Sequence, residues 1–186
     1  GTATSLEVDI SRPPRVDESF VTTPDIMAGT LTDLPTDVKT VTYYVQGPQL
    51  NGITDSLSTL SGDVINNSAS QSISGLVRRM IAKNALQKAY TDGESDRIMR
   101  TGTLISREVV GLNFEYYDGT EWLTDWDSSV QGLPLVVRLT IAMQDPGVPM
   151  DQRLQPPLNL TNMGGQSLVD QGVTLYSTLI PIPGAA

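Results

Sequence analysis

Apolar and polar residues alternate along several stretches of this chain, as they do in β-strands that bury one face. The alternation is strictest at Val110, Leu112, Phe114 and Tyr116. Alternation, or enrichment in β-branched and aromatic residues, predicts further strands at 6–10, 38–47, 135–143 and 173–182. We therefore expect a β-rich α+β domain that is built on antiparallel sheets and has long loops.

Residues 76–90, LVRRMIAKNALQKAY, fit two patterns. The apolar residues of this segment would share one face of a helix, yet a strand through 75–82 fits many of the same residues. We interpret the segment as a strand that runs into a short helical or irregular piece.

Glycine and proline mark the turns and the irregular connections. The chain has 16 glycines and 12 prolines, which argues against a helical bundle. Asp118-Gly119 ends the strictest strand and predicts a hairpin turn. Residues 12–37 are predicted to be an irregular connection. Segments near 48–72 and 145–172 are interpreted as insertions, the first as a mobile one outside the core. The chain, 1–186, is expected to be a single domain.

Composition removes several kinds of chemistry. The chain has no histidine and no cysteine, so a Ser-His-Asp triad, an imidazole zinc ligand, a disulfide and a thiolate are excluded. The net charge of −9 disfavours nucleic acid as a partner. No apolar run is long enough to span a bilayer, and no targeting signal is visible. We expect neither an enzyme nor a bound cofactor.

Basic residues concentrate in one segment of this acidic chain. Residues 76–110 carry seven arginines and lysines against four acidic residues. This surplus is small for phosphate binding, so we interpret it as a solvated face or as a docking patch for an acidic protein surface. The candidate docking residues are Arg78, Arg79 and Arg97.

Two groups of acidic residues could bind calcium or act as paired carboxylates. The segment Asp92-Gly93-Glu94-Ser95-Asp96 places oxygen ligands at alternating positions but lacks the closing glutamate of a calcium loop. The second group shows no calcium-loop spacing and consists of Asp118, Glu121, Asp125 and Asp127. We interpret both groups as solvated loop acids. An extracytoplasmic hydrolase, the enzyme alternative, would require two close acids in a concave pocket.

Half of the aromatic residues lie close together, with five of the chain's ten between Phe114 and Trp126. Trp122 and Trp126 could form a platform that stacks a sugar or a peptide, as in a stand-alone extracytoplasmic β-domain. The cluster could also be hairpin packing, because aromatic residues in strands usually pack against their cross-strand neighbours. We favour packing, and exposed tryptophans would favour the binding domain.

Four motifs, in their order along the chain, resemble one known family. Val41 to Val45 reads V-x-Y-Y-V, and Gly75 to Arg79 reads G-L-V-R-R. VVGLNFEYYDGTEWLTDW follows, and LPLVVRLTIAM comes after a short spacer. This order resembles the soluble domain of the J-type minor pseudopilins of the bacterial type II secretion system. The matching positions of the last two motifs are Val109, Leu112, Phe114, Tyr116 or Tyr117, Asp118, Gly119, Trp122, Trp126, Leu133, Pro134, Val137, Leu139 and Ile141.

The resemblance implies a structural protein with a pseudopilin-like domain. J-type minor pseudopilins join the I- and K-type ones in a complex at the pseudopilus tip, where they are implied to start assembly and to meet secreted substrates. The domain would lie in the periplasm, held to the inner membrane by an N-terminal helix that we expect to be missing from this chain. The aromatic cluster would be a hairpin core. Because segments 48–72 and 145–172 are longer than the family pattern, another minor pseudopilin or prepilin-like protein is the alternative.

Overall fold

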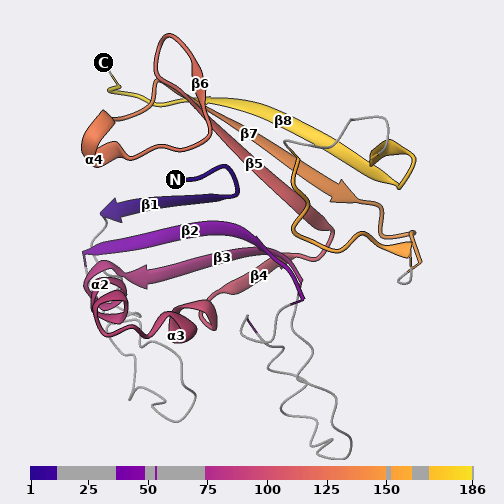
Figure 1. Ribbon diagram of the computed structural model, residues 1–186, viewed down its shortest axis with the longest axis horizontal. Helices are drawn as coiled ribbons and strands as arrows, with labels where there is room; N and C mark the ends of the chain where they lie inside the picture. The colour runs from indigo at the N-terminus through magenta and orange to yellow at the C-terminus, as the bar shows by residue number, and fades with distance from the viewer. Residues whose placement is uncertain (12–36, 49–52, 54–73, 150–151, 161–167, 186) are drawn as a thin grey trace, which may run out of the picture.

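The computed structural model describes residues 1–11, 37–48, 53, 74–149, 152–160 and 168–185. These residues form two antiparallel sheets of four strands each, which confirms the prediction of a β-rich antiparallel architecture. In Figure 1 the sheets lie one above the other, and the N-terminus lies between them.

The first sheet has the strand order β1-β2-β3-β4. Its strands are β1 (Ser5–Ser11), β2 (Val38–Gln46), β3 (Gly75–Ala82) and β4 (Thr103–Ser106). The chain leaves β3 directly into a helix, so the predicted change from strand to helix within 76–90 is confirmed. Two short helices follow β3 and cover one face of this sheet, α2 (Lys83–Thr91) and α3 (Ser95–Met99). They bury Leu86, Ala89 and Ile98 together with Ile81 of β3.

The second sheet has the strand order β6-β5-β7-β8. Its strands are β5 (Val109–Tyr117), β6 (Trp122–Leu123), β7 (Val136–Gln144) and β8 (Val173–Pro181). A short helix, α4 (Ser128–Gln131), lies between β6 and β7. The predicted hairpin at Asp118-Gly119 is confirmed, because Tyr117 pairs with Trp122 across the turn.

The register of the second sheet determines which of its side chains face the first sheet. Leu112 pairs with Ile141, Phe114 with Leu139, and Tyr116 with Val137. Side chains that are paired across antiparallel strands lie on the same face, so these six residues form one continuous apolar face. Val45 of β2 is buried against the same cluster, and Leu6 and Leu76 pack on it from β1 and β3.

The structure shows buried residues in both segments that were interpreted as insertions. Ile53, within the segment interpreted as an insertion outside the core, is buried, and its backbone exchanges two hydrogen bonds with the side chain of Gln46, at 2.9 and 3.2 Å. Leu158 and Leu168, within 145–172, are buried with Val110 and Val173 in a second core cluster. Because their side chains are buried, Ile53, Leu158 and Leu168 belong to the core. Residues 12–36, 49–52, 54–73, 150–151 and 161–167 lie outside the described residues.

In the part of the chain that the structure describes, no helix is long and apolar enough to cross a membrane.

Candidate functional site

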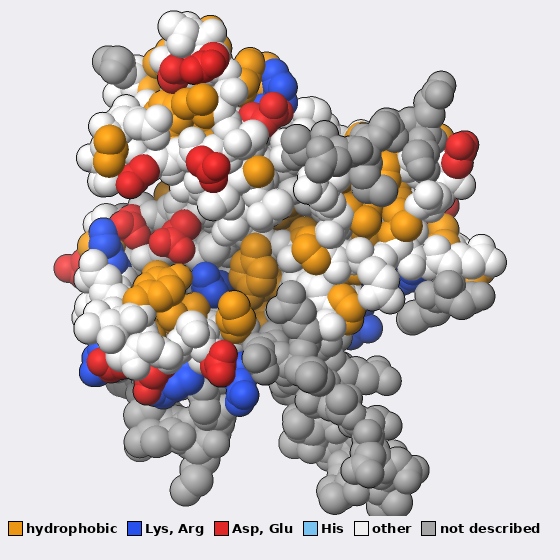
Figure 2. All heavy atoms as spheres, in the orientation of Figure 1, with side chains coloured by type: hydrophobic (Ala, Val, Ile, Leu, Met, Phe, Trp, Pro, Cys, Tyr) orange, Lys and Arg blue, Asp and Glu red, His pale blue; other side chains and the backbone are white. Residues whose placement is uncertain are grey.

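An apolar groove of about 970 Å³ opens between the two sheets. Its wall from the second sheet is the apolar face of β5 and β7, extended by Ile180 of β8. Its wall from the first sheet consists of Leu6, Val8, Tyr43 and Leu76. In Figure 2 the surface is hollowed between the region of β6 and α4 and the region of β1 and β2.

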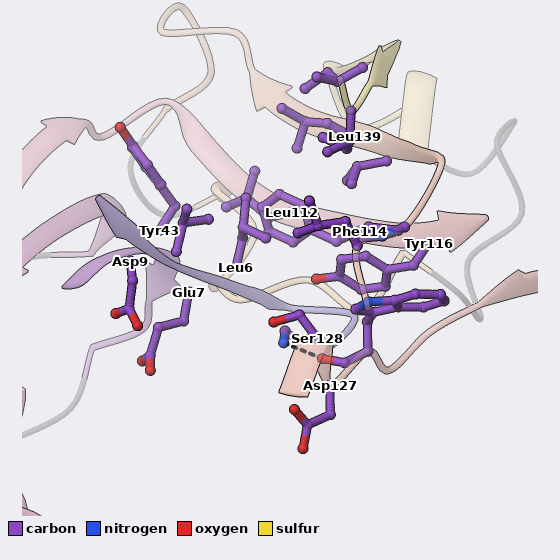
Figure 3. Close-up of a pocket in the computed structure, with 18 of the residues that line it drawn as sticks. Leu6, Glu7, Asp9, Tyr43, Leu112, Phe114, Tyr116, Asp127, Ser128 and Leu139 are labelled. Atoms are coloured by element: carbon purple, nitrogen blue, oxygen red, sulfur yellow. Dashed lines mark hydrogen bonds between the residues drawn. The ribbon is translucent and has the colours of Figure 1, made fainter. Parts of the chain in front are cut away.

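The side chains of the groove are mainly hydrophobic and only partly covered. Figure 3 shows Leu6, Leu112, Phe114 and Leu139 close together, whereas the carboxylates of Glu7 and Asp9 lie on the far side of β1. Leu139 and Ile141 are half-buried, and Ile180 is 42% exposed. A connected apolar surface of this kind marks a site where a helix, a peptide or another protein packs.

The first residues of the chain lie beside the inner part of the groove. The Gly1 amino group donates a hydrogen bond to the Trp126 carbonyl at 2.7 Å, and the Trp126 amide donates to the Gly1 carbonyl at 3.0 Å. The Phe114 amide donates to the Ala3 carbonyl at 2.8 Å. Residues 1–3 therefore run along β5, and Gly1 itself lines the groove.

Three of the clustered aromatic residues form the packed floor of this region. Phe114, Tyr116 and Trp126 are buried, with Trp126 only 8% exposed. The rings of Tyr116 and Trp126 stack with centroids 6.2 Å apart, and Trp126 Nε1 donates to the Gly132 carbonyl at 2.9 Å. Burial, with a smaller effect from the charge of Asp125, raises the pKa of Tyr116 to about 12. These contacts identify Phe114, Tyr116 and Trp126 as core residues.

The other two aromatic residues lie on the opposite face of the second sheet. Tyr117 and Trp122 are paired across the hairpin with ring centroids 5.1 Å apart. Arg138 covers the Trp122 ring at 4.0 Å and also pairs with Glu115 at 3.0 Å. The two tryptophans therefore face opposite sides of the sheet, so they do not form one stacking platform.

The motif residues between the aromatic rings shape the turn and the groove. Asp118 Oδ1 accepts hydrogen bonds from the amides of Thr120 and Glu121 at 2.6 and 2.8 Å. These bonds hold the pKa of Asp118 below its ordinary value. Gly119 has a φ of 109°, which favours glycine. Leu133 and Pro134 follow α4 and line the groove.

The three candidate docking arginines do not form one patch. Arg78 and Arg79 are neighbours on β3, so their side chains leave opposite faces of the sheet. Arg78 is exposed. Arg79 lies over the Tyr44 ring at 5.4 Å and donates to the Ile98 carbonyl of α3 at 3.5 Å. Arg97 pairs with Glu94 at 2.6 Å. Arg78 also makes a local contact, a hydrogen bond to Met80 Sδ at 3.7 Å, but it is the exposed one of the three and therefore the candidate most open to a partner.

The acidic residues that could have held a metal are engaged in local contacts. Asp92 pairs with Lys88 at 2.6 Å. Asp9 of β1, which belongs to neither candidate group, also makes local contacts: it pairs with Lys83 at 2.5 Å and accepts a hydrogen bond from Thr40, and these contacts lower the pKa of Asp9. Within the described residues, no group of three or more histidine, cysteine, aspartate or glutamate side chains could hold a metal ion.

Asp127 caps the helix α4. Its Oδ1 accepts hydrogen bonds from the hydroxyl and the amide of Ser129 at 2.6 and 2.9 Å, which lowers the pKa of Asp127. Aspartate is a preferred residue at this position because its side chain satisfies backbone amides of the first helical turn. Asp127 lines the groove, yet its local bonds account for its placement.

No protein-family model, no curated protein and no solved structure matches this chain. The resemblance to pseudopilins therefore stands on the quoted motif residues alone. Sequence reasoning did not identify the groove, although the alternation at Leu6 and Val8 already showed that β1 has an apolar face. What was missing was the position of that face relative to β5 and β7.

Proposed function

We propose that this chain is the periplasmic domain of a minor pseudopilin of the J type, an assembly component at the tip of a type II secretion pseudopilus. The observation that carries the proposal is the apolar groove between the sheets. It is about 970 Å³ in volume, and its walls come from strands that also carry the family motifs. A surface of this kind suits a packed helix better than it suits a polar substrate.

The resemblance implies an anchoring helix before residue 1, and that helix is the occupant we assign to the groove. Gly1 lines the groove and is held to Trp126 by two hydrogen bonds. A helix that precedes residue 1 would therefore end beside the apolar face of β5 and β7. Packing there would cover Leu139, Ile141 and Ile180, which are only partly buried in the described structure.

A role in assembly also agrees with the chemistry of the described residues. Their acidic side chains near the groove are held by lysine, threonine or backbone amides, and the partly buried candidate arginines, Arg79 and Arg97, make local contacts. Arg78 is left as the candidate contact to an acidic neighbour such as an I- or K-type minor pseudopilin. The alternative, sugar or peptide binding by Trp122 and Trp126 together, is disfavoured because the two rings lie on opposite faces.

The experiment that tests the proposal is to read the codons upstream of residue 1 in the full-length gene. A short basic leader that ends in glycine, followed by an apolar segment of about 20 residues with glutamate at its fifth position, is expected. An ordinary cleavable signal peptide, or a native start at Gly1, would contradict the proposal and favour a free binding domain.

The assignment of the groove has its own test in the full-length protein. The 186-residue chain contains no cysteine, so a cysteine at Leu139 can be combined with single cysteines along the preceding helix. Disulfides should form at helix positions spaced by three or four residues, because these positions share one helix face. Cross-linking with no such period would refute the assignment, even if the gene encodes the expected helix.

A further inference from the structure

The four edge strands of the two sheets differ in how well they are protected from pairing. The edges are β1 and β4 in the first sheet and β6 and β8 in the second. β1 carries Glu7 and Asp9, β4 has four residues, and β6 has two. Charges and short length are the devices by which proteins keep edge strands from pairing with other chains. β8 has neither, because it is nine residues long and carries no charged side chain.

Hydrogen bonding in the second sheet shows which backbone groups of β8 are open. The Ile182 amide donates to the Leu135 carbonyl at 3.0 Å, and the register of β7 and β8 continues this pairing along the strand. Because bonded and non-bonded pairs alternate in an antiparallel ladder, Tyr176, Thr178 and Ile180 bond to β7. Leu175 and Ser177 therefore direct their N–H and C=O groups away from the sheet, as does Leu179.

The side chains at this open edge are apolar and exposed. Leu179 is 59% exposed, Tyr176 is 56% exposed, and Leu175 is 43% exposed. Pro181 follows at the end of the strand, in the outward-facing alternation, where its missing N–H ends the open ladder. The outward-facing Leu175, Ser177 and Leu179 lie before this proline, in a stretch whose length suits pairing with one other strand.

We propose that β8 pairs with β8 of a second copy of this chain, in antiparallel orientation about a two-fold axis at Ser177. In this register Ser177 faces Ser177 of the second copy. On either side of the axis, Leu175 of one copy faces Leu179 of the other. The outward N–H and C=O groups are then paired, and the exposed leucines make cross-strand contacts. The two sheets join into one continuous sheet.

Charge also favours this edge as the contact between two copies. Each chain carries a net charge of −9, so most pairs of surfaces repel each other. The uncharged β8 lets two copies meet without placing like charges opposite each other. The remaining long-range repulsion should weaken as salt is added, so the dimer should tighten between about 0.01 M and about 0.15 M salt. This inference does not depend on the proposed role in secretion.

The test combines sedimentation equilibrium with amide hydrogen exchange on the 186-residue chain. A dimer that forms with rising concentration is expected, with new protection at the amides of Leu175, Ser177 and Leu179. The amides of Tyr176 and Thr178 should be protected at every concentration because they bond to β7. A dimer held by side-chain contacts alone would not protect alternate amides of β8 in this way.

A charge at the two-fold axis provides the matched variant. Ser177→Lys places two ammonium groups opposite each other and should raise the dimer dissociation constant by about tenfold or more. Gln87→Lys, on the exposed face of α2, adds the same charge far from β8 and should leave the constant unchanged. Both variants make the protein less acidic, so a weaker dimer in Ser177→Lys alone reports the local contact.

Three results would overturn the inference. The first is a monomer at all concentrations up to about 1 mM. The second is a dimer without the alternating protection, or one that Ser177→Lys leaves intact, since association would then use another surface. The third is protection of the three amides only after another pseudopilin domain is added, which would assign the edge to a different partner.

Discussion

Replacing Trp126 by alanine should destabilise the domain far more than replacing Trp122. The Trp126 indole is 8% exposed, stacks on Tyr116 at 6.2 Å and donates to the Gly132 carbonyl at 2.9 Å. Removing a buried tryptophan side chain costs about 3–5 kcal/mol. Trp122 is half-buried and would lose its contacts with Arg138 and Tyr117, which together contribute about 1–2 kcal/mol.

The assay is urea unfolding followed by far-ultraviolet circular dichroism, because either substitution changes tryptophan fluorescence directly. A total unfolding free energy of about 5–15 kcal/mol is ordinary, so the loss in Trp126→Ala should move the midpoint clearly. The slope of free energy against urea should stay the same in both variants if the transition remains two-state. A loss below about 1 kcal/mol in Trp126→Ala, or an equal loss in both variants, would refute the interpretation of Trp126 as a core residue.

Three further changes test other parts of the structure. Tyr116→Phe should reduce the loss of stability that the domain shows between pH 10 and pH 12. The folded state raises the pKa of Tyr116 from 10.0 to about 12, so this tyrosine stabilises the fold fully below pH 10 and loses its contribution as the pH rises. Parallel losses in both proteins, measured by urea unfolding, would contradict this. Gly75→Ala should lower the melting temperature more than Gly93→Ala. Both glycines have a positive φ, but only the methyl group added at Gly75 meets the backbone of β4. Equal decreases in melting temperature would show that contact with β4 does not matter. Lys83→Met should lower the free energy of unfolding by less than about 1 kcal/mol at neutral pH, because the Lys83–Asp9 pair is exposed. It should also make stability depend less on pH in acid, because the lowered pKa of Asp9 gives stability that is lost as the pH falls through that pKa. A loss well above this value at pH 7 would contradict the small contribution assigned to the pair.

The strands were predictable because a two-residue period is a local property of the chain. Of the four residues that showed it most strictly, Leu112, Phe114 and Tyr116 are buried in one core cluster of β5. The fourth, Val110, is buried in the second cluster, because the register of β5 and β7 shifts between Val109 and Gly111. The division of 103–117 into β4 and β5 was not predictable in the same way. The two strands belong to different sheets, and only the arrangement of the sheets separates them.

The candidate site was predictable in part. Adjacent residues of a strand face opposite sides, so the separation of Arg78 from Arg79 follows once β3 is accepted as a strand. The same rule places Tyr117 on the face opposite Tyr116. The position of Trp126 depends instead on the chain after β6, which turns back so that the ring stacks on Tyr116. The groove depends on the spacing of two sheets, which no local pattern records.

The most direct test of the central claim is to mix this domain with the soluble domains of the I- and K-type minor pseudopilins encoded in the same genome. Size-exclusion chromatography with light scattering would give the mass of any complex. A minor pseudopilin of the tip should form a complex that contains all three kinds of domain, and Arg78→Glu should weaken it if the partner surface is acidic. Separate elution of the domains at concentrations of about 100 μM, well above the Kd of an ordinary specific complex, would contradict a role in pseudopilus assembly.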